Sequence, residues 1–230
     1  MRRPPSASEH AARLAAAGPG ELEARAAARG WRVVVGVDEV GRGPLAGPVV
    51  AAAVALRVDQ LLPGLDDSKK LTPARRERLD PVIRAEALAF GLGQVEPARI
   101  DALDIRRAAL EAMSLAFAAL LQTCAPGGVL PDGVLPDGVL VDGLDVFPWP
   151  PGAPALPVEA FVRGDGRSRA IAAASVVAKV HRDGLMRAYH ARWPVYGFDR
   201  HMGYPTPAHL AALREHGPCE IHRRSFRGVL

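Results

Sequence analysis

Four acidic residues stand where they could act together on one substrate. Asp38, Glu39, Asp142 and Asp165 each lie at or just past the end of an apolar stretch, with a glycine within two positions. Converging carboxylates raise one another's pKa unless cations neutralise them. Mg²⁺ and Mn²⁺ accept such oxygen ligands, and a pair of these ions promotes phosphoester hydrolysis. We therefore expect a two-metal nuclease-type site, against the simpler alternative that strands often end in Asp-Gly turns.

Asp38 and Glu39 are consecutive, which limits how they can share a site. Successive residues of a strand point to opposite faces of the sheet. Both carboxylates reach one site only if the strand stops or bends there, and Gly41 and Gly43 permit such a bend.

The elements that must position these acids follow an α/β pattern. β-Branched and apolar runs predict strands, the first two as a hairpin, and Thr72 before Pro73 is a suitable N-cap for the first long helix. The expected strands cover residues 32–38, 49–56, 89–95, 139–141 and 158–162. A first helix is expected to begin at residue 73. Further helices are expected over residues 97–122, as one or two helices, and over residues 169–189 and 207–215. Strands interleaved with helices in this order indicate an α/β fold with acids at strand ends.

A tandem repeat precedes the third acid. Residues 129–143 read VLPDG, VLPDG and VLVDG. Only the third copy lacks the proline that would prevent strand pairing, so we expect Asp142 at a strand end. Asp132 and Asp137 are then expected in turns, as duplicated positions without a part in the chemistry.

The composition indicates one catalytic-size domain. The chain has 230 residues, with 29 basic and 25 acidic side chains, so 29 − 25 gives a net charge of +4. We expect residues 1–30, which are rich in alanine, to be a weakly helical or disordered extension, and residues 31–230 to be the catalytic domain. Two cysteines exclude a disulfide framework, and no apolar run reaches the roughly 20 residues of a membrane span. We expect a cytoplasmic protein.

The positive charge is concentrated in the last third of the chain. Residues 163–230 contain 12 Lys or Arg and 5 Asp or Glu, a net charge of +7, which leaves −3 for the first 162 residues. A basic region of this kind is typical of proteins that meet a phosphate backbone, although it could also be a solvated face. The seven histidines show no HxxxH pair with a third partner, so we do not expect a zinc site.

Six segments taken together resemble prokaryotic ribonuclease HII. They are GVDEVGRGPLAGPVVAAAV at 36–54, DSKKL at 67–71, VDG at 141–143, GD at 164–165, IAAASVVAKVHRDGLM at 171–186 and YGFDRHMGYPTPAHL at 196–210. The similarity covers about residues 31–228, in order. It implies a ribonuclease H-like mixed five-stranded sheet with flanking helices and a helical C-terminal part. The family's four metal-binding catalytic carboxylates fall on Asp38, Glu39, Asp142 and Asp165.

The resemblance also implies an activity and substrates. Members of the family are endonucleases that cut the RNA strand of RNA/DNA hybrids and nick 5′ of ribonucleotides embedded in duplex DNA, leaving 3′-hydroxyl and 5′-phosphate ends. We expect the same substrates here, Mg²⁺ or Mn²⁺ as cofactor, no membrane partner, and action as a monomer.

Substrate contacts carry over residue by residue. The glycines of Gly41-Arg42-Gly43 let the backbone approach a sugar and read its 2′-hydroxyl, as this loop does in the family. Tyr204 resembles the family tyrosine that packs on a neighbouring sugar, whereas we expect Tyr196 to be in the core. We expect Ser68, Lys69 and Lys70 to contact phosphate or to support the acids, and Lys179 to meet the charge of the nucleic-acid backbone.

Other positions of the C-terminal third carry weaker expectations. Arg182 and Asp183 are expected to pair with each other. The segment His222-Arg223-Arg224 resembles the C-terminal HRR stretch of the family, and we expect it to fold back towards the site. One departure is Met202, where family members commonly have a lysine, which removes one expected phosphate contact.

Three alternatives remain open at this point. A ribonuclease HIII would need a sizeable additional N-terminal domain, which 30 alanine-rich residues cannot form. A catalytically silent hybrid-binding protein would have no need for intact carboxylates. A metal-dependent nuclease of DNA junctions would share the acids but not the Gly41–Gly43 loop.

Overall fold

The computed structural model describes residues 19–66, 71–131 and 133–229, and a five-stranded mixed sheet lies at its centre. The strands are β1 (Val33–Val40), β2 (Val49–Arg57), β3 (Ala89–Val95), β4 (Gly138–Asp142) and β5 (Val158–Phe161), in the order β3-β2-β1-β4-β5. β1 and β2 form the expected hairpin, β3 is antiparallel to β2, and β4 and β5 run parallel to β1. The α/β fold class is confirmed.

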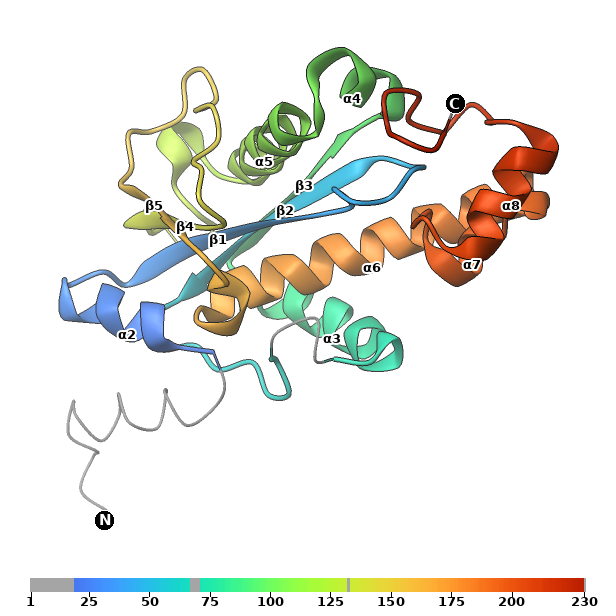
Figure 1. Ribbon diagram of the computed structural model, residues 1–230. Coiled ribbons are helices and arrows are strands. Elements are labelled where there is room, and N and C mark those ends of the chain that lie inside the picture. The colour runs from blue at the N-terminus through green and yellow to red at the C-terminus, as the bar shows by residue number, and fades with distance from the viewer. Residues whose placement is uncertain (1–18, 67–70, 132, 230) are drawn as a thin grey trace.

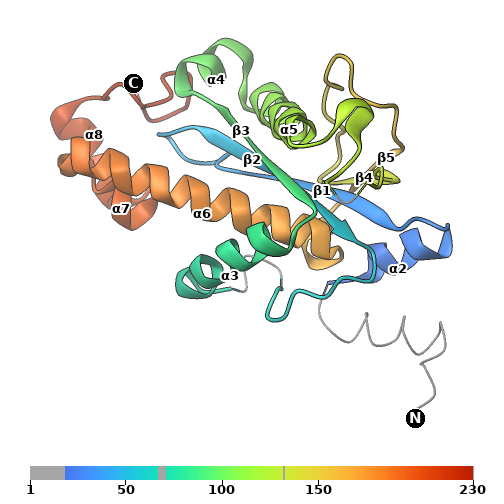
Figure 2. The same ribbon diagram turned by 180° about the vertical axis from the view of Figure 1, so that it is seen from behind.

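Helices cover both faces of this sheet (Figures 1 and 2). On one face, Val34 and Val54 pack in a core with α6 (Arg169–Arg192) and α3 (Pro73–Glu86). On the other face, Val35 and Ala53 pack in a second core with α5 (Ile105–Gln122). Burial on both faces explains why β1 and β2 read as continuous apolar runs instead of alternating patterns.

Local signals set where the helices begin. The Thr72 hydroxyl accepts a hydrogen bond from the backbone N–H of Arg75 at 3.4 Å, as expected for the N-cap of α3. Residues 97–122 form two helices, α4 (Pro97–Leu103) and α5. They are separated by Asp104, which has φ 105° and accepts a hydrogen bond from the N–H of Arg107 at 2.9 Å.

One glycine allows α6 to lie directly on the sheet. A side chain at Gly36 of β1 would place its Cβ 2.0 Å from the carbonyl carbon of Ala170, in the first turn of α6. The Ser168 hydroxyl caps that turn by accepting from the N–H of Ile171 at 3.2 Å. The first turn of α6 therefore lies against Gly36, which is two residues before Asp38 on β1.

Residues 19–30 pack on the catalytic body, which differs from the extension expected for residues 1–30. Helix α2 (Glu21–Ala28) buries Leu22 and Ala26 in the core beneath α6. The Glu23 carboxylate, fully buried, accepts from the Ser168 hydroxyl at 2.6 Å and from the N–H of Ala170 at 3.0 Å. The sequence-based boundary at residue 30 missed this contact because one acid among alanines gives no periodic signal. Residues 1–18 lie outside the described part.

The repeat meets the sheet as predicted for its third copy only. β4 begins at Gly138 and ends at Asp142. Asp137 lies beside the start of β1 and is not part of a free turn, because its carboxylate accepts from the N–H groups of Arg32 and Val33 at 2.7 and 2.9 Å. Asp132 lies outside the described residues.

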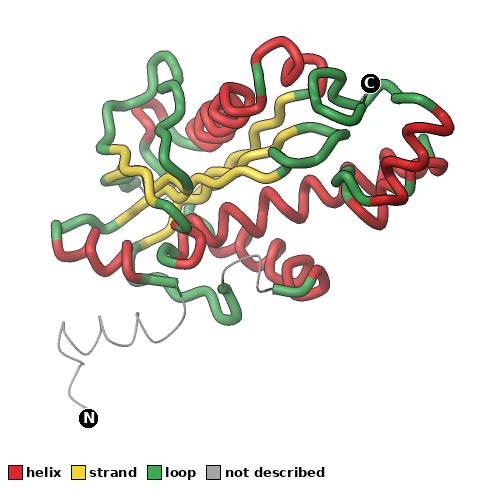
Figure 3. Tube along the Cα trace, viewed as in Figure 1, coloured by secondary structure: helices red, strands yellow, loops and turns green. Residues whose placement is uncertain are grey.

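The C-terminal part is helical and packs against the loop between β1 and β2. It contains η3 (Pro194–Tyr196), α7 (Phe198–His201) and α8 (Pro207–His216), and Figure 3 shows the loop extending towards these helices. The N–H of Leu45 donates to the carbonyl of Gly203 at 2.8 Å, and the N–H of Gly47 donates to that of Ile221 at 2.9 Å. In the described part of the chain, no helix combines the length and apolarity that crossing a membrane requires.

Candidate active site

The four predicted acids come from three elements that end at one edge of the sheet. Asp38 and Glu39 lie near the end of β1, Asp142 is the last residue of β4, and Asp165 lies in η2 (Gly164–Gly166), which follows β5. Because β1, β4 and β5 are parallel, their C-terminal ends meet at the same edge.

Asp38 has the most perturbed carboxyl of this group. Its residue is 5% exposed, and burial raises the pKa of the Asp38 carboxyl well above its usual range. Three neighbouring carboxylates raise the pKa further, while a hydrogen bond with Ser175 of α6 opposes the rise; the carboxylates are Glu39, Asp142 and Asp165. All four acids thus share one electrostatic environment.

Glu39 reaches the same region beside the end of β1, which stops at Val40. β1 stays paired with β2 through Val40, but its pairing with β4 ends at Val37. Beyond Val37 no residue of β4 pairs with β1, so side chains from both faces of β1 can reach the same space. Burial raises the pKa of Glu39, and the guanidinium of Arg42, 3.4 Å away, opposes this shift.

The carboxylates suit divalent cations by their donor chemistry. Asp38, Asp142 and Asp165 accept backbone N–H hydrogen bonds from Glu39, Gly164 and Gly166 at 2.7, 2.6 and 3.0 Å. Within residues 19–66, 71–131 and 133–229, no three His, Cys, Asp or Glu side chains are gathered closely enough to hold an ion. Buried, mutually repelling oxygen ligands nevertheless match what Mg²⁺ and Mn²⁺ bind. The donor chemistry of the residues present fits such ions.

A cavity of about 310 Å³ joins the acids to the expected substrate contacts. Residues expected at the site form most of its lining: Asp38, Glu39, Gly41, Arg42, Gly43, Asp142, Lys179 and Tyr204. Asp165 is buried beside this lining, at 1% exposure, and is not part of it. Ser68, Lys69 and Lys70 lie outside the described residues.

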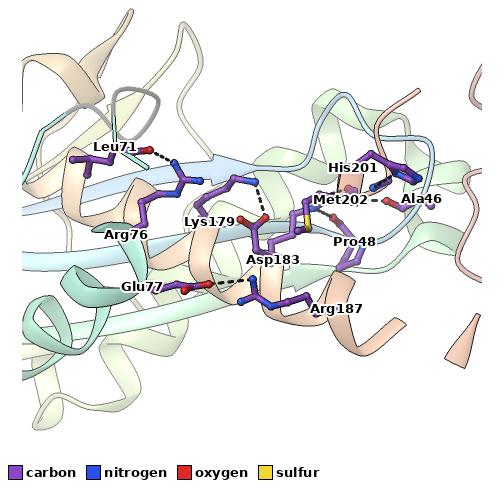
Figure 4. Close-up of polar contacts among 12 residues, drawn as sticks. Ala46, Pro48, Leu71, Arg76, Glu77, Lys179, Asp183, Arg187, His201 and Met202 are labelled. Carbon is purple, nitrogen blue, oxygen red and sulfur yellow. Dashed lines mark hydrogen bonds and ion pairs between the residues drawn. The ribbon is translucent and has the colours of Figure 1, made fainter. Parts of the chain in front are cut away.

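Two buried arginines hold the loop at 41–48 by its carbonyl groups. Arg223 donates to the carbonyls of Gly41, Arg42, Pro44 and Gly47 at 2.6–3.1 Å. Arg182 donates to those of Ala46, Pro48 and Met202 at 3.0 Å, and Figure 4 labels these three acceptors. The predicted pairing of Arg182 with Asp183 is wrong, because Arg182 extends to the loop. The C-terminal segment does fold back to this loop.

Both arginines stay charged in the interior. Burial lowers the pKa of Arg182 to about 10 and that of Arg223 to about 9. Among the described residues, no carboxylate forms a salt bridge with either guanidinium, so backbone carbonyls satisfy them instead. Part of the basic excess of the C-terminal third is therefore structural, and does not face solvent.

Lys179 and Arg76 bring positive charge to the lining of the cavity, and Figure 4 shows their side chains with their polar partners. Lys179 forms an ion pair with Asp183, one turn along α6, at 2.6 Å. Arg76 of α3 is 9% exposed and donates to the carbonyl of Leu71. Sequence reasoning missed Arg76, because an arginine in an exposed-looking helix gives no sign that it faces a site. It also assigned no role to Ser175, although Ser175 lies in the alanine-rich segment that carried the resemblance.

Tyr196 lies in the core as predicted, and Tyr204 lies at the surface beside Gly43. Tyr204 is 42% exposed, and its ring lies 3.4 Å from where a Cβ at Gly43 would be. Tyr196 is 5% exposed and donates its hydroxyl hydrogen to the carbonyl of Gly217 at 2.8 Å. Met202 has φ 49° and contributes its carbonyl to Arg182, so this position serves the loop through its backbone.

A mixed sheet with four carboxylates at the ends of its parallel strands defines a nuclease of the ribonuclease H class. The family model described as Ribonuclease HII matches residues 35–229. The chain belongs to the ribonuclease HII family, and it is a ribonuclease H enzyme.

Individual relatives agree with this assignment. The ribonuclease HII of Nitrosococcus oceani is 52% identical over 196 residues, which cover 85% of this chain and 89% of the relative. The crystal structure of ribonuclease H2 from Pyrococcus horikoshii matches with a TM-score of 0.69 at 26% identity, covering 86% of this chain and 95% of that one. Bst-RNase HIII, solved in complex with Mn²⁺, shares the fold with a TM-score of 0.64 at 16% identity, covering 86% and 68%.

Proposed function

We propose that this ribonuclease H is a metal-dependent endonuclease that hydrolyses the RNA strand of RNA/DNA hybrids and nicks 5′ of ribonucleotides embedded in duplex DNA, leaving 3′-hydroxyl and 5′-phosphate ends. The observation that carries the proposal is the buried Asp38 carboxyl, which shares one cavity with the Gly41–Gly43 loop and Tyr204. Charge repulsion among the acids favours the binding of cations, and the loop and ring offer a surface for a sugar.

The four acids would hold two Mg²⁺ or Mn²⁺ ions. When bound, these ions supply activation of the attacking water and neutralisation of the charge on the leaving 3′ oxygen. The chain's own part is to fix the ligands: Ser175 bonds the Asp38 carboxyl, and the N–H of Gly164 holds Asp142. No protein nucleophile is needed for this chemistry.

The loop would recognise the ribose through its backbone. Arg182 and Arg223 occupy the carbonyls of Gly41, Arg42, Pro44, Ala46, Gly47 and Pro48. With its carbonyls held in this way, the loop can present N–H groups to a 2′-hydroxyl, and the 2′-hydroxyl is the group that separates RNA from DNA. Tyr204, beside Gly43, would pack on the adjoining sugar.

Cationic side chains in the cavity lining would contact the phosphate backbone. Lys179 lines the cavity, held by Asp183, and Arg76 lies in the same lining. We include Ser68, Lys69 and Lys70 in this role from the sequence resemblance. Such contacts fix the position of the duplex and carry no sequence information.

The remaining parts of the proposal concern the whole molecule. We propose a monomer whose catalytic domain spans residues 31–230. Helix α2 packs on this domain. A cytoplasmic location agrees with two cysteines that are both free.

Cleavage of a duplex with one embedded ribonucleotide tests the proposal. The same sequence in all-DNA form is the control, and both are assayed with Mg²⁺, with Mn²⁺ and with EDTA. We expect a single nick 5′ of the ribonucleotide in either metal, with a product that a polymerase extends from its 3′-hydroxyl. Equal cutting of the all-DNA duplex would favour a DNA-junction nuclease. Tight binding without cleavage in any metal would favour a silent hybrid-binding protein.

A further inference from the structure

Two buried histidines form a hydrogen-bonded chain that ends at the backbone of Tyr204, a residue that lines the cavity. His209 of α8 is fully buried and His222 of the C-terminal segment is 2% exposed, with their Nε2 atoms 3.0 Å apart. Nδ1 of His222 lies 2.9 Å from the backbone nitrogen of Cys219, and Nδ1 of His209 lies 2.9 Å from the carbonyl oxygen of Tyr204. The chain thus joins the C-terminal segment to the backbone of Tyr204.

Its two ends fix where the protons are. A backbone N–H can only donate, so Nδ1 of His222 accepts from Cys219 and the ring proton of His222 is on Nε2. That Nε2–H donates to Nε2 of His209, which must be unprotonated. His209 then carries its proton on Nδ1 and donates it to the carbonyl of Tyr204, which can only accept. Every group in the chain is satisfied when both imidazoles are neutral.

The C-terminal segment is linked both to Tyr204 and to the Gly41–Gly43 loop. His222 is hydrogen-bonded to His209, which bonds the Tyr204 carbonyl, and the next residue, Arg223, donates to carbonyls of the loop. We propose that His209 and His222 are positioning residues for the nuclease reaction, a relay of two neutral imidazoles that fixes Tyr204 against Gly43. This rests on the proposed function in one respect, the contact of Tyr204 with the substrate.

The surroundings keep the relay neutral. Burial lowers the pKa of His209, and His201, stacked on it with ring centroids 4.5 Å apart, lowers it further, while the Tyr204 carbonyl opposes the shift. Burial, followed by the charge of His209, lowers the pKa of His222 to about 4. The groups that face the pair are His201 from α7, Tyr196 from η3, and Cys219 and Arg224 from the C-terminal segment. A proton added to His209 would set two N–H groups against each other across 3.0 Å.

Two isosteric substitutions separate the halves of the relay. The amide of His209→Asn can replace Nδ1 and still donate to the Tyr204 carbonyl. The amide of His209→Gln reaches the Nε2 position and can accept from His222, but it leaves Tyr204 without its donor. In single-turnover cleavage of a duplex with one ribonucleotide, we expect His209→Gln to be at least about tenfold slower than His209→Asn, because small misplacements of bound groups are costly in rate. Binding at fixed salt should stay within a few-fold for both. Equal rates for the two variants would overturn the relay.

The Tyr204→Ala background shows whether the effect passes through Tyr204. There, His209→Gln should slow cleavage no further, because the group that it positions is gone. A full additional loss would mean that His209 acts by another route, which would overturn the proposal.

Nitrogen-15 NMR of the histidine rings tests the relay without any activity or variant. At pH 7 we expect two neutral rings, His209 in the Nδ1–H form and His222 in the Nε2–H form. A charged ring or the reversed tautomers would overturn the proposal even if the enzyme cleaves. A parent enzyme that does not cleave, with the expected tautomers in place, would instead overturn the proposed function.

Discussion

The acid site buries negative charge, and the C-terminal part that holds the loop buries positive charge. The two regions differ in what surrounds the buried charge. Asp38 lies among other carboxylates, and burial raises its pKa. Arg182 and Arg223 lie among backbone carbonyls, which accept seven hydrogen bonds from the two guanidiniums. The arginines are satisfied within the protein, whereas the acids repel one another.

This difference separates a structural use of charge from a functional one. A buried charge is costly unless it is paired or hydrogen-bonded. The arginines meet that condition through the loop, so their charge stabilises the loop's shape. The carboxylates meet it only in part, so the site is set to bind cations from solution. The same logic predicts different responses to substitution and to pH.

The largest expected effect is loss of cleavage on neutralising an acid. In Asp38→Asn and Asp165→Asn, an amide replaces a charged metal ligand, so we expect activity to fall below detection at saturating Mg²⁺. Hybrid binding should stay within a few-fold, since affinity comes mainly from phosphate contacts. Parallel cleavage and binding titrations check this. Substantial cleavage by either variant would remove it from the set of metal ligands.

The second prediction uses pH to set the two regions against each other. His222 has a pKa of about 4 in the fold and 6.5 as the reference value, so between these values the unfolded chain binds a proton that the folded protein does not. Stability therefore falls as pH falls through this window, by roughly 3 kcal/mol from this group. The pKa of Asp38 is raised, so its folded form binds a proton more readily, and this site gains stability as pH falls.

Denaturant unfolding at pH 7 and pH 4.5 measures both contributions. His222→Gln should show a smaller loss of stability on acidification than the parent, and Asp38→Asn should show a larger one. If His222→Gln keeps the parent's full pH dependence, the imidazole is not buried as a neutral group.

The arrangement of the acids was largely predictable from the sequence. Strand ends with a neighbouring glycine predicted the four carboxylates that the structure brings together, and the lost proline of the third repeat copy located the start of β4 before Asp142. These signals are local, so the residues themselves carry them. How Glu39 joins the site was not predictable in the same way, because it depends on where β4 stops pairing with β1.

The C-terminal part was less predictable because its interactions join distant residues. Arg223 contacts carbonyls about 180 positions earlier in the chain, and a carbonyl acceptor leaves no trace in residue type. Arg182 was expected to pair with its neighbour Asp183, since sequence proximity was the only available guide. The packing of α2 through Glu23 is a further contact of this kind.

The third prediction concerns Tyr204, which lines the same cavity as the acids and the Gly41–Gly43 loop. Tyr204→Ala should slow single-turnover cleavage at an embedded ribonucleotide by about a hundredfold, because a misplacement of about 1 Å at the reacting phosphate can cost this much. Binding should weaken far less. Tyr196→Ala is the matched control, whose buried ring makes loss of stability its main effect. A larger rate loss in a folded Tyr196→Ala enzyme would show that the wrong tyrosine was assigned to the substrate.

The smallest expected effect separates the repeat copies. Asp142→Asn should abolish cleavage, whereas Asp137→Asn and Asp132→Asn should leave cleavage at the parent's rate. The Asp137 carboxylate accepts from two N–H groups at the start of β1, and an asparagine oxygen still accepts there without the charge. We therefore expect Asp137→Asn to lower the free energy of unfolding by about 1 kcal/mol, the difference between a charged and a neutral acceptor. Cleavage rates and denaturant midpoints for the three variants decide the matter. An inactive but folded Asp137→Asn protein would place a catalytic carboxylate one repeat earlier than the sheet register does.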